Sequence, residues 1–165
     1  MIVEIKTIRT KTFTARIIHF GMFLWAIFNG LKLKQCYNHC EVKFGELTSG
    51  AIAQGIKTRK WQTYVDEHKG KYFKTHTYNF TFSDEEWRKA QEYLNRAENT
   101  PYEFENFWYH AVKIFTGKWK GSTKPTELYC YEHGIRVLNC KNNIDLNTNL
   151  NPYEAEIVFG LLCDL

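Results

Sequence analysis

The sequence lacks a hydrophobic run long enough to cross a membrane as a helix. Its main apolar run, residues 20–28, is well short of the roughly 20 apolar residues that a bilayer-spanning helix needs. We expect no signal peptide either, because a polar, strand-like stretch precedes this run and no small-residue cleavage site follows it. We therefore expect a cytoplasmic protein with no transmembrane segment. The run itself is expected to form a buried helix or, as the alternative, an interfacial one.

The chain also lacks the cysteine pattern of a disulfide-stabilised domain. A length of 165 residues is enough to bury a core without cross-links, which makes a reducing compartment the simpler expectation. The number of cysteines is odd and their spacing matches no disulfide framework: Cys36, Cys40, Cys130, Cys140 and Cys163.

A concentrated charge of one sign is missing as well. The net charge of +4 is spread over the whole chain, whereas a nucleic-acid-binding face needs a compact basic cluster. We therefore expect no nucleic-acid partner. There is no internal repeat or low-complexity tract, and the 44% hydrophobic content suits one globular domain over residues 1–165.

Several stretches alternate apolar and polar residues, which is the pattern of half-buried β-strands. In the best supported of them, aromatic residues are interleaved with Lys and Thr. The predicted strands cover residues 2–8, 36–44, 51–56, 61–65 and 72–82.

Helices are predicted from capping signals and from apolar periodicity. Ser83, with Glu86 three residues later, forms a capping box that begins a helix reaching about residue 97. Asn151 and Pro152 begin a last helix as its cap and first residue. Further helices are expected at 14–29, 103–115 and 127–138, with polar loops at 117–125 and 139–151. This order predicts an α+β fold in which an antiparallel sheet of about five strands packs against helices.

Two short segments carry residues suited to nucleophilic catalysis. In Tyr37-Asn38-His39-Cys40-Glu41-Val42 a histidine lies within a predicted strand, and in Tyr129-Cys130-Tyr131-Glu132-His133-Gly134 a cysteine lies in the first turn of a predicted helix. A thiol attacks as thiolate, which a helix N-terminus and a neighbouring imidazole both favour. The pair Cys130 and His39 therefore predicts a cysteine hydrolase. The histidine precedes the cysteine, the reverse of the order in papain.

These segments resemble the circularly permuted papain-like hydrolases, a group related to NlpC-type cell-wall peptidases and to lecithin-retinol acyltransferase-like proteins. The likeness rests on residues 38–42, on residues 49–56 (SGAIAQGI) and on Cys130-Tyr131-Glu132. The predicted N-terminal strand and helix, and the step Thr100-Pro101-Tyr102-Glu103, are similar too. The resemblance implies a permuted papain-like fold, with Cys130 as nucleophile and His39 as base.

The family usually has a third polar residue that orients the imidazole. The resemblance places Ser49 or Gly50 near that point, with Glu46 just before it. We expect Ser49 or Glu46 to serve, and Tyr102 and Tyr129 to contact substrate or the oxyanion. Glu132 projects away from the cysteine on a helix, so we expect it to be structural.

Two other interpretations remain open from the residues alone. Cys36-x-x-His39 and Cys130-x-x-His133 have spacings compatible with a structural zinc site, although residues 36 and 39 of one strand point to opposite faces. A non-catalytic module is the other alternative, because the aromatic segment 103–115 and the apolar run 20–28 are suited to binding a lipid or a protein.

The hydrolase hypothesis predicts cleavage of an amide or ester bond through an acyl-enzyme, with no cofactor and no metal. A peptide, a peptidoglycan amide and an acyl-lipid are all compatible substrates. The sequence does not select among them, nor does it indicate an oligomeric state.

Overall fold

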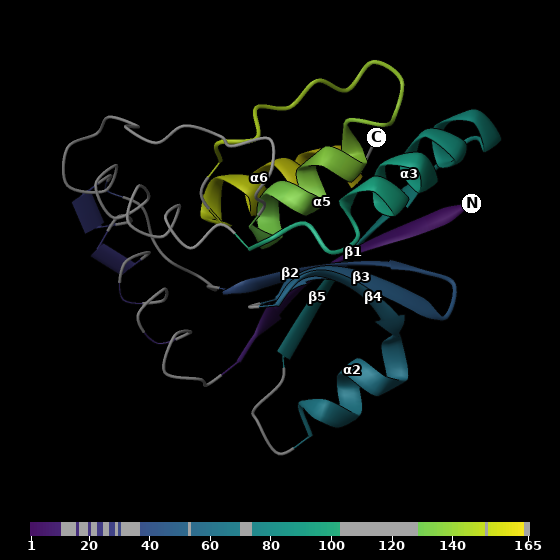
Figure 1. Ribbon diagram of the computed structural model, residues 1–165. Helices are drawn as coiled ribbons and strands as arrows, with labels where there is room; N and C mark the ends of the chain where they lie inside the picture. The colour runs from purple at the N-terminus through teal and green to yellow at the C-terminus, as the bar shows by residue number, and fades with distance from the viewer. Residues whose placement is uncertain are drawn as a thin grey trace.

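We describe the fold from a computed structural model of the chain. The part of the chain that it describes comprises residues 1–10, 16, 20, 23–24, 27–28, 30, 37–52, 54–69, 74–102, 129–150 and 152–163. Within these residues the fold is mixed α and β, as the sequence predicts, with one antiparallel sheet and helices on both of its faces (Figure 1).

The sheet has five strands in the order β4-β3-β2-β1-β5. They are β1 (Ile2–Arg9), β2 (His39–Phe44), β3 (Leu47–Ile52), β4 (Gly55–Lys60) and β5 (Lys74–Thr81). Strand β1 lies between β2 and β5 and pairs antiparallel with both, so that Ile8 is opposite His39. Strands β2, β3 and β4 form two successive hairpins.

One face of the sheet is the core of the molecule. It carries the inward-pointing apolar residues of successive strands, among them Ile5 and Val42, and both of these are fully buried. Three helices cover this face, as Figure 1 shows above the sheet: α3 (Asp84–Ala97), α5 (Cys130–Leu138) and α6 (Pro152–Cys163). Helix α5 lies against β2 and β3, and α6 lies against β5.

The opposite face of the sheet is polar. The strand register places Glu41 and Lys43 of β2 on this face, together with Lys6 of β1 and Arg59 of β4. The short helix α2 (Trp61–Glu67) follows β4 directly and covers part of this face, below the sheet in Figure 1. Its Tyr64 is 1% exposed and lies against Arg59, so this helix buries an aromatic ring beside the polar face of the sheet.

The local signals of the sequence locate two helices correctly. Ser83 and Glu86 form the predicted capping box at the start of α3, in which Ser83 Oγ accepts from the Glu86 amide and the Glu86 carboxylate accepts from the Ser83 amide. Pro152 is the first residue of α6, as predicted. The expected helix 103–115, the loop 117–125 and the cap Asn151 lie outside the described residues. Of the expected helix 14–29, the positions that are described are helical.

One predicted strand is wrong and another is wrong in part. Residues 61–65 belong to helix α2, whose first amide, at Trp61, donates to the Glu46 carbonyl of the neighbouring turn. The predicted strand 51–56 spans the turn of a hairpin, since β3 ends at Ile52 and β4 begins at Gly55. Gly55 has φ +102°, a backbone conformation suited to glycine, and this allows the chain to reverse there.

Candidate active site

The sulfur of Cys130 lies at the N-terminus of α5. Cys130 is the first residue of this helix and Tyr129 is its N-cap, so the thiol is closer to the helix end than a cap at Thr126 would place it. Thr126 itself lies outside the described residues. The first hydrogen bond of the helix runs from the His133 amide to the Tyr129 carbonyl. The preceding amides therefore direct their positive ends toward the region of the thiol.

The N-terminus of α5 is fixed by an acidic residue of its own first turn. Glu132, at the third helical position, accepts a hydrogen bond from the Tyr129 backbone amide. Its Oε1 atom also accepts from Arg136 Nε and Nη2, at 3.0 and 2.7 Å. Burial raises the pKa of this carboxyl despite these partners. Glu132 therefore has the structural environment that the sequence predicts for it, because it holds the helix start that carries Cys130.

The imidazole of His39 is hydrogen-bonded to Cys130, although the two residues are far apart in the sequence. His39 is the first residue of β2, and its side chain is 17% exposed. Burial alone would lower the pKa of His39. The hydrogen bonds to Cys130 and Glu41 and the negative charge of both partners outweigh that effect and raise the pKa to about 10. At neutral pH the ring is therefore an imidazolium.

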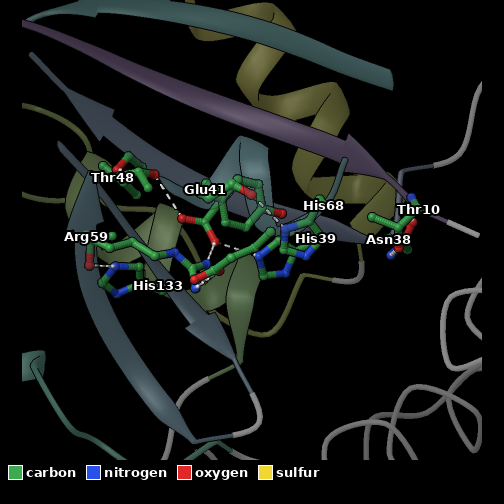
Figure 2. A network of polar contacts seen from close by, with 12 residues as sticks. Thr10, Asn38, His39, Glu41, Thr48, Arg59, His68 and His133 are labelled. Carbon is green, nitrogen blue, oxygen red and sulfur yellow. Dashed lines mark hydrogen bonds and ion pairs between the residues drawn. The ribbon is translucent and has the colours of Figure 1, made fainter. Parts of the chain in front are cut away.

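Glu41 is the acid that contacts His39. Its Oε1 atom lies 2.8 Å from His39 Nε2, and Figure 2 shows the two side chains extending from the same strand. Residues two apart on a strand share a face, so this contact follows directly from the geometry of β2. Because Nε2 is engaged by Glu41, Nδ1 is the ring nitrogen that remains for the hydrogen bond to Cys130.

The carboxylate of Glu41 is fully buried and is held by two further donors. Arg59 Nη2 donates to Oε1 at 3.0 Å, and Thr48 Oγ1 donates to Oε2 at 2.8 Å (Figure 2). Burial alone would raise the pKa of this carboxyl. The hydrogen bond and positive charge of His39, together with Arg59 and Thr48, hold that pKa below its usual value. The acid is therefore ionised and locked in position.

Glu41 occupies the space that a side chain at position 50 would need. Gly50 lies opposite Glu41 in the β2–β3 register, and a Cβ atom built there would overlap the Glu41 carboxylate. The resemblance locates the third polar residue near this position on β3. In the structure the carboxylate beside His39 comes from the neighbouring strand instead, and a glycine makes room for it.

His39 also lies against the aromatic side chains of α2. Its ring is stacked on Tyr64, with centroids 6.2 Å apart and planes inclined by 17°. The Arg59 guanidinium also lies over Tyr64, 4.5 Å from the centre of its ring. Tyr64 therefore contacts both of the cations that neutralise Glu41.

Of the two tyrosines expected at the site, Tyr102 contacts the sulfur. Its hydroxyl is hydrogen-bonded to Cys130, and burial together with the charge on that sulfur raises the tyrosine pKa. The side chain of Tyr129 takes a different direction. Its hydroxyl donates to the backbone carbonyls of Thr148 and Leu150, in the loop before α6, and so anchors that loop to the start of α5.

The structure places neither Ser49 nor Glu46 beside His39. Ser49 is on the core face of β3, where its hydroxyl lies 3.0 Å from His133 Nε2. Glu46 is exposed in the turn that follows β2, at the end of the strand opposite to His39. Both residues are therefore misassigned as orienting groups for His39. Both residues are close to His39 in the sequence, but neither side chain lies beside the His39 imidazole in the structure.

His133 belongs to a separate buried network. Its two ring nitrogens lie 3.0 Å from the hydroxyls of Ser49 and Tyr93, and burial lowers its pKa to about 4. The ring is neutral at pH 7 and tethers α5 to β3 and α3. Among the described residues no group of three or more His, Cys, Asp and Glu side chains has the arrangement of a metal site. Cys36, a member of the considered zinc set, lies outside them.

Comparison with known proteins identifies no relative. No protein family matches the chain, and neither the curated proteins nor the solved structures contain a match. In the part of the chain that is described, no helix has both the length and the apolar character needed to cross a bilayer.

Proposed function

We propose that the chain is a cysteine hydrolase that cleaves an amide or ester bond through an acyl-enzyme on Cys130. The observation that carries the proposal is the linear connection Cys130–His39–Glu41, with the sulfur at a helix N-terminus and the carboxylate buried. A nucleophile bonded to a base, with the base oriented by a third group, is the arrangement that nucleophilic catalysis requires. The permuted papain-like relationship is part of this proposal.

In the first half-reaction Cys130 is the nucleophile and His39 the acid. The Cys130 thiolate attacks the substrate carbonyl carbon, forming a carbon–sulfur bond and moving an electron pair onto the carbonyl oxygen. The first amides of α5 are suited to stabilising that oxyanion. When the intermediate collapses, the bond to the leaving nitrogen or oxygen breaks, and the His39 imidazolium donates its Nδ1 proton to it. The products are the free amine or alcohol and a Cys130 thioester.

In the second half-reaction His39 acts as a base. The neutral imidazole removes a proton from water, which attacks the thioester carbon. The carbon–sulfur bond then breaks, releasing the carboxylic acid and restoring the thiolate–imidazolium pair. Glu41 stays ionised throughout, fixes the ring orientation through Nε2 and stabilises the positive ring.

Tyr102 is suited to orienting the Cys130 sulfur before it attacks the substrate. Its hydroxyl and the His39 ring are both hydrogen-bond donors to Cys130, so the thiolate is bonded from two sides. The arrangement favours a localised, oriented sulfur anion.

The proposal is tested with p-nitrophenyl acetate, a small activated ester. We expect nitrophenolate release together with an acetyl group on Cys130, detected by mass spectrometry, and the loss of both in Cys130→Ala and His39→Ala. Cys140→Ala is the matched control, because its thiol donates to the Arg136 carbonyl at the other end of α5 and should not affect the rate. Unchanged nitrophenolate release by Cys130→Ala would contradict the proposal.

A further inference from the structure

A group of large apolar side chains is exposed on the segment between β1 and β2. Phe20, Phe23 and Ile27 are 62%, 52% and 56% exposed, and each lies at a helical position. Their spacing of three and four residues places them along one side of a helix. Phe28, which is 65% exposed, follows directly. Such a cluster is an interaction surface rather than part of a core.

The same segment carries charge of only one sign. Between β1 and β2 the sequence contains no Asp or Glu, whereas basic residues lie on both sides of the apolar run: Lys11, Arg16, Lys32 and Lys34. Arg16 is exposed. The mild net charge of the chain conceals this asymmetry, because acidic residues are concentrated elsewhere.

The segment begins and ends beside the candidate active site. The Thr10 amide donates to Asn38 Oδ1 at 2.9 Å, and Asn38 Nδ2 donates to Thr10 Oγ1 at 3.1 Å, and both contacts are buried. These bonds fasten the two ends of the segment at the residue that precedes His39. Figure 2 shows Thr10 and Asn38 as a pair on the same side of the network as His39.

We propose that the exposed side chains of Phe20, Phe23 and Ile27 dock this protein on the surface of an anionic lipid bilayer. Apolar side chains of an interfacial helix enter the headgroup and acyl boundary, and flanking basic residues attract anionic headgroups. A segment with aromatic residues in the centre, cations on both sides and no acid matches that chemistry.

A second copy of this chain is a poorer occupant of the surface. It would place two acid-free basic segments against each other, and like charges facing one another oppose association. The docking rests on exposure and charge alone and not on the proposed hydrolase chemistry. The two proposals therefore stand or fall separately, since vesicle binding requires no turnover.

The test is co-sedimentation with vesicles of phosphatidylcholine containing phosphatidylglycerol. We expect the wild-type protein to bind, and Phe23→Glu to lower the partition coefficient about tenfold or more, because a phenyl ring leaves the acyl boundary and an anion replaces it. Leu161→Glu is the matched control, since Leu161 is a 68% exposed apolar residue on α6, outside the segment. This variant should bind like the wild type.

The charge requirement is tested separately. Arg16→Gln should weaken binding to the anionic vesicles about fivefold, as expected for one basic residue near such a surface. Arg88→Gln removes a cation from the exposed surface of α3 and serves as the control that leaves binding unchanged. Vesicles of phosphatidylcholine alone should bind the wild type more weakly than anionic ones.

Three results would overturn the proposal. One is the absence of wild-type binding to anionic vesicles, and another is equal binding by the wild type and Phe23→Glu. The third is concentration-dependent self-association in sedimentation velocity without vesicles, abolished by Phe23→Glu, which would assign the surface to a second copy. A thermal transition of Phe23→Glu equal to that of the wild type confirms that the altered side chain is exposed in the fold.

Discussion

At the scale of single residues, the central feature is the buried carboxylate of Glu41. It accepts from His39, Arg59 and Thr48 while being fully removed from solvent. A buried anion with a full set of donors is rigid, and removing one partner leaves the others uncompensated. The same contacts that satisfy Glu41 therefore fix the orientation and the protonation state of the His39 ring.

Replacing Glu41 should change the titration of His39. The carboxylate favours the imidazolium, so Glu41→Gln should lower the His39 pKa from about 10 and shift its deprotonation to lower pH. The measurement is an NMR titration of the His39 ring carbons. Glu92→Gln, an exposed change on α3, should leave that titration unaltered. An unshifted His39 pKa in Glu41→Gln would show that the Glu41 carboxylate does not stabilise the imidazolium form of His39.

The third polar residue shows why sequence reasoning fails at one position of the site. The sequence points to Ser49 and Glu46 because they follow the histidine strand in the order of the chain. Glu41 lies closer, and the alternation of a strand places it on the same face as His39, so its signal is present in the sequence. The partners Arg59 and Thr48 are not predictable, because the strand register that brings them to Glu41 is a tertiary property.

At the scale of secondary-structure elements, the β2–β3 hairpin depends on a glycine opposite the acid. Gly50→Ala should displace Glu41, since the added Cβ would overlap its carboxylate. Overpacking together with the loss of buried donors should lower the free energy of unfolding by about 2–3 kcal/mol. Urea denaturation measures this change. Gly160→Ala is the matched control, because its Cβ would meet only Tyr78 at an ordinary 3.9 Å.

Gly50→Ala could instead unfold at the same urea concentration as the wild type. That result would contradict the close approach of the Glu41 carboxylate to position 50 of β3. A loss of stability in Gly160→Ala of similar size would mean that any added methyl group is costly in this protein.

The start of α3 provides a second prediction at this scale. Ser83→Ala removes the acceptor for the Glu86 amide and should cost about 1 kcal/mol of stability, whereas Ser83→Thr keeps an acceptor and should cost less. The difference between the two variants in urea midpoint measures the cap. Equal midpoints would show that the reciprocal bond from the Ser83 amide to Glu86 is sufficient.

The elements that the sequence predicts correctly have signals confined to a few neighbouring residues. The capping box of Ser83 and the initiating Pro152 act within one helical turn, which is why they locate α3 and α6. The aromatic and β-branched content of residues 61–65 predicts a strand instead of the observed helix. They form a helix because β4 ends at Lys60 and the chain must then turn onto the polar face, a constraint that arises only from the assembled sheet.

At the scale of the whole molecule, α5 connects the core to the site. Its first residue carries the thiol, while His133 and Gly134 one turn later pack into the interior. Gly134 permits this approach, since a Cβ there would be 3.0 Å from the Cys40 sulfur. The position of Cys130 relative to His39 therefore depends on how the whole helix packs against the sheet. For this reason the proximity of the two side chains cannot be calculated from the sequence alone.

Buried ionisable groups of this core should make its stability depend on pH. Burial raises the pKa of Glu156 to about 7, above its value in an unfolded chain, so its ionised form opposes folding above pH 7. The penalty should diminish as the pH falls from about 7 to about 4.5. Glu156→Gln should therefore be more stable than the wild type at about pH 8, with a smaller advantage at about pH 5.

Urea denaturation at the two pH values measures that difference. The amide oxygen introduced by Glu156→Gln can still accept from the Tyr131 hydroxyl, which bonds the Glu156 carboxylate at 3.1 Å, so the comparison isolates the charge. An advantage that is the same at both pH values would show that Glu156 does not titrate in this range.

The thiolate–imidazolium pair is tested most directly by the rate of iodoacetamide alkylation at each cysteine, followed from about pH 5 to about pH 10 by mass spectrometry. We predict that Cys130 is alkylated faster than Cys140 at neutral pH, because its sulfur is hydrogen-bonded to the His39 imidazole. We further predict that His39→Ala slows this reaction and leaves Cys140 unaffected. Slow alkylation of Cys130 at every pH, unchanged by His39→Ala, would contradict the thiolate–imidazolium pair and with it the proposed hydrolase.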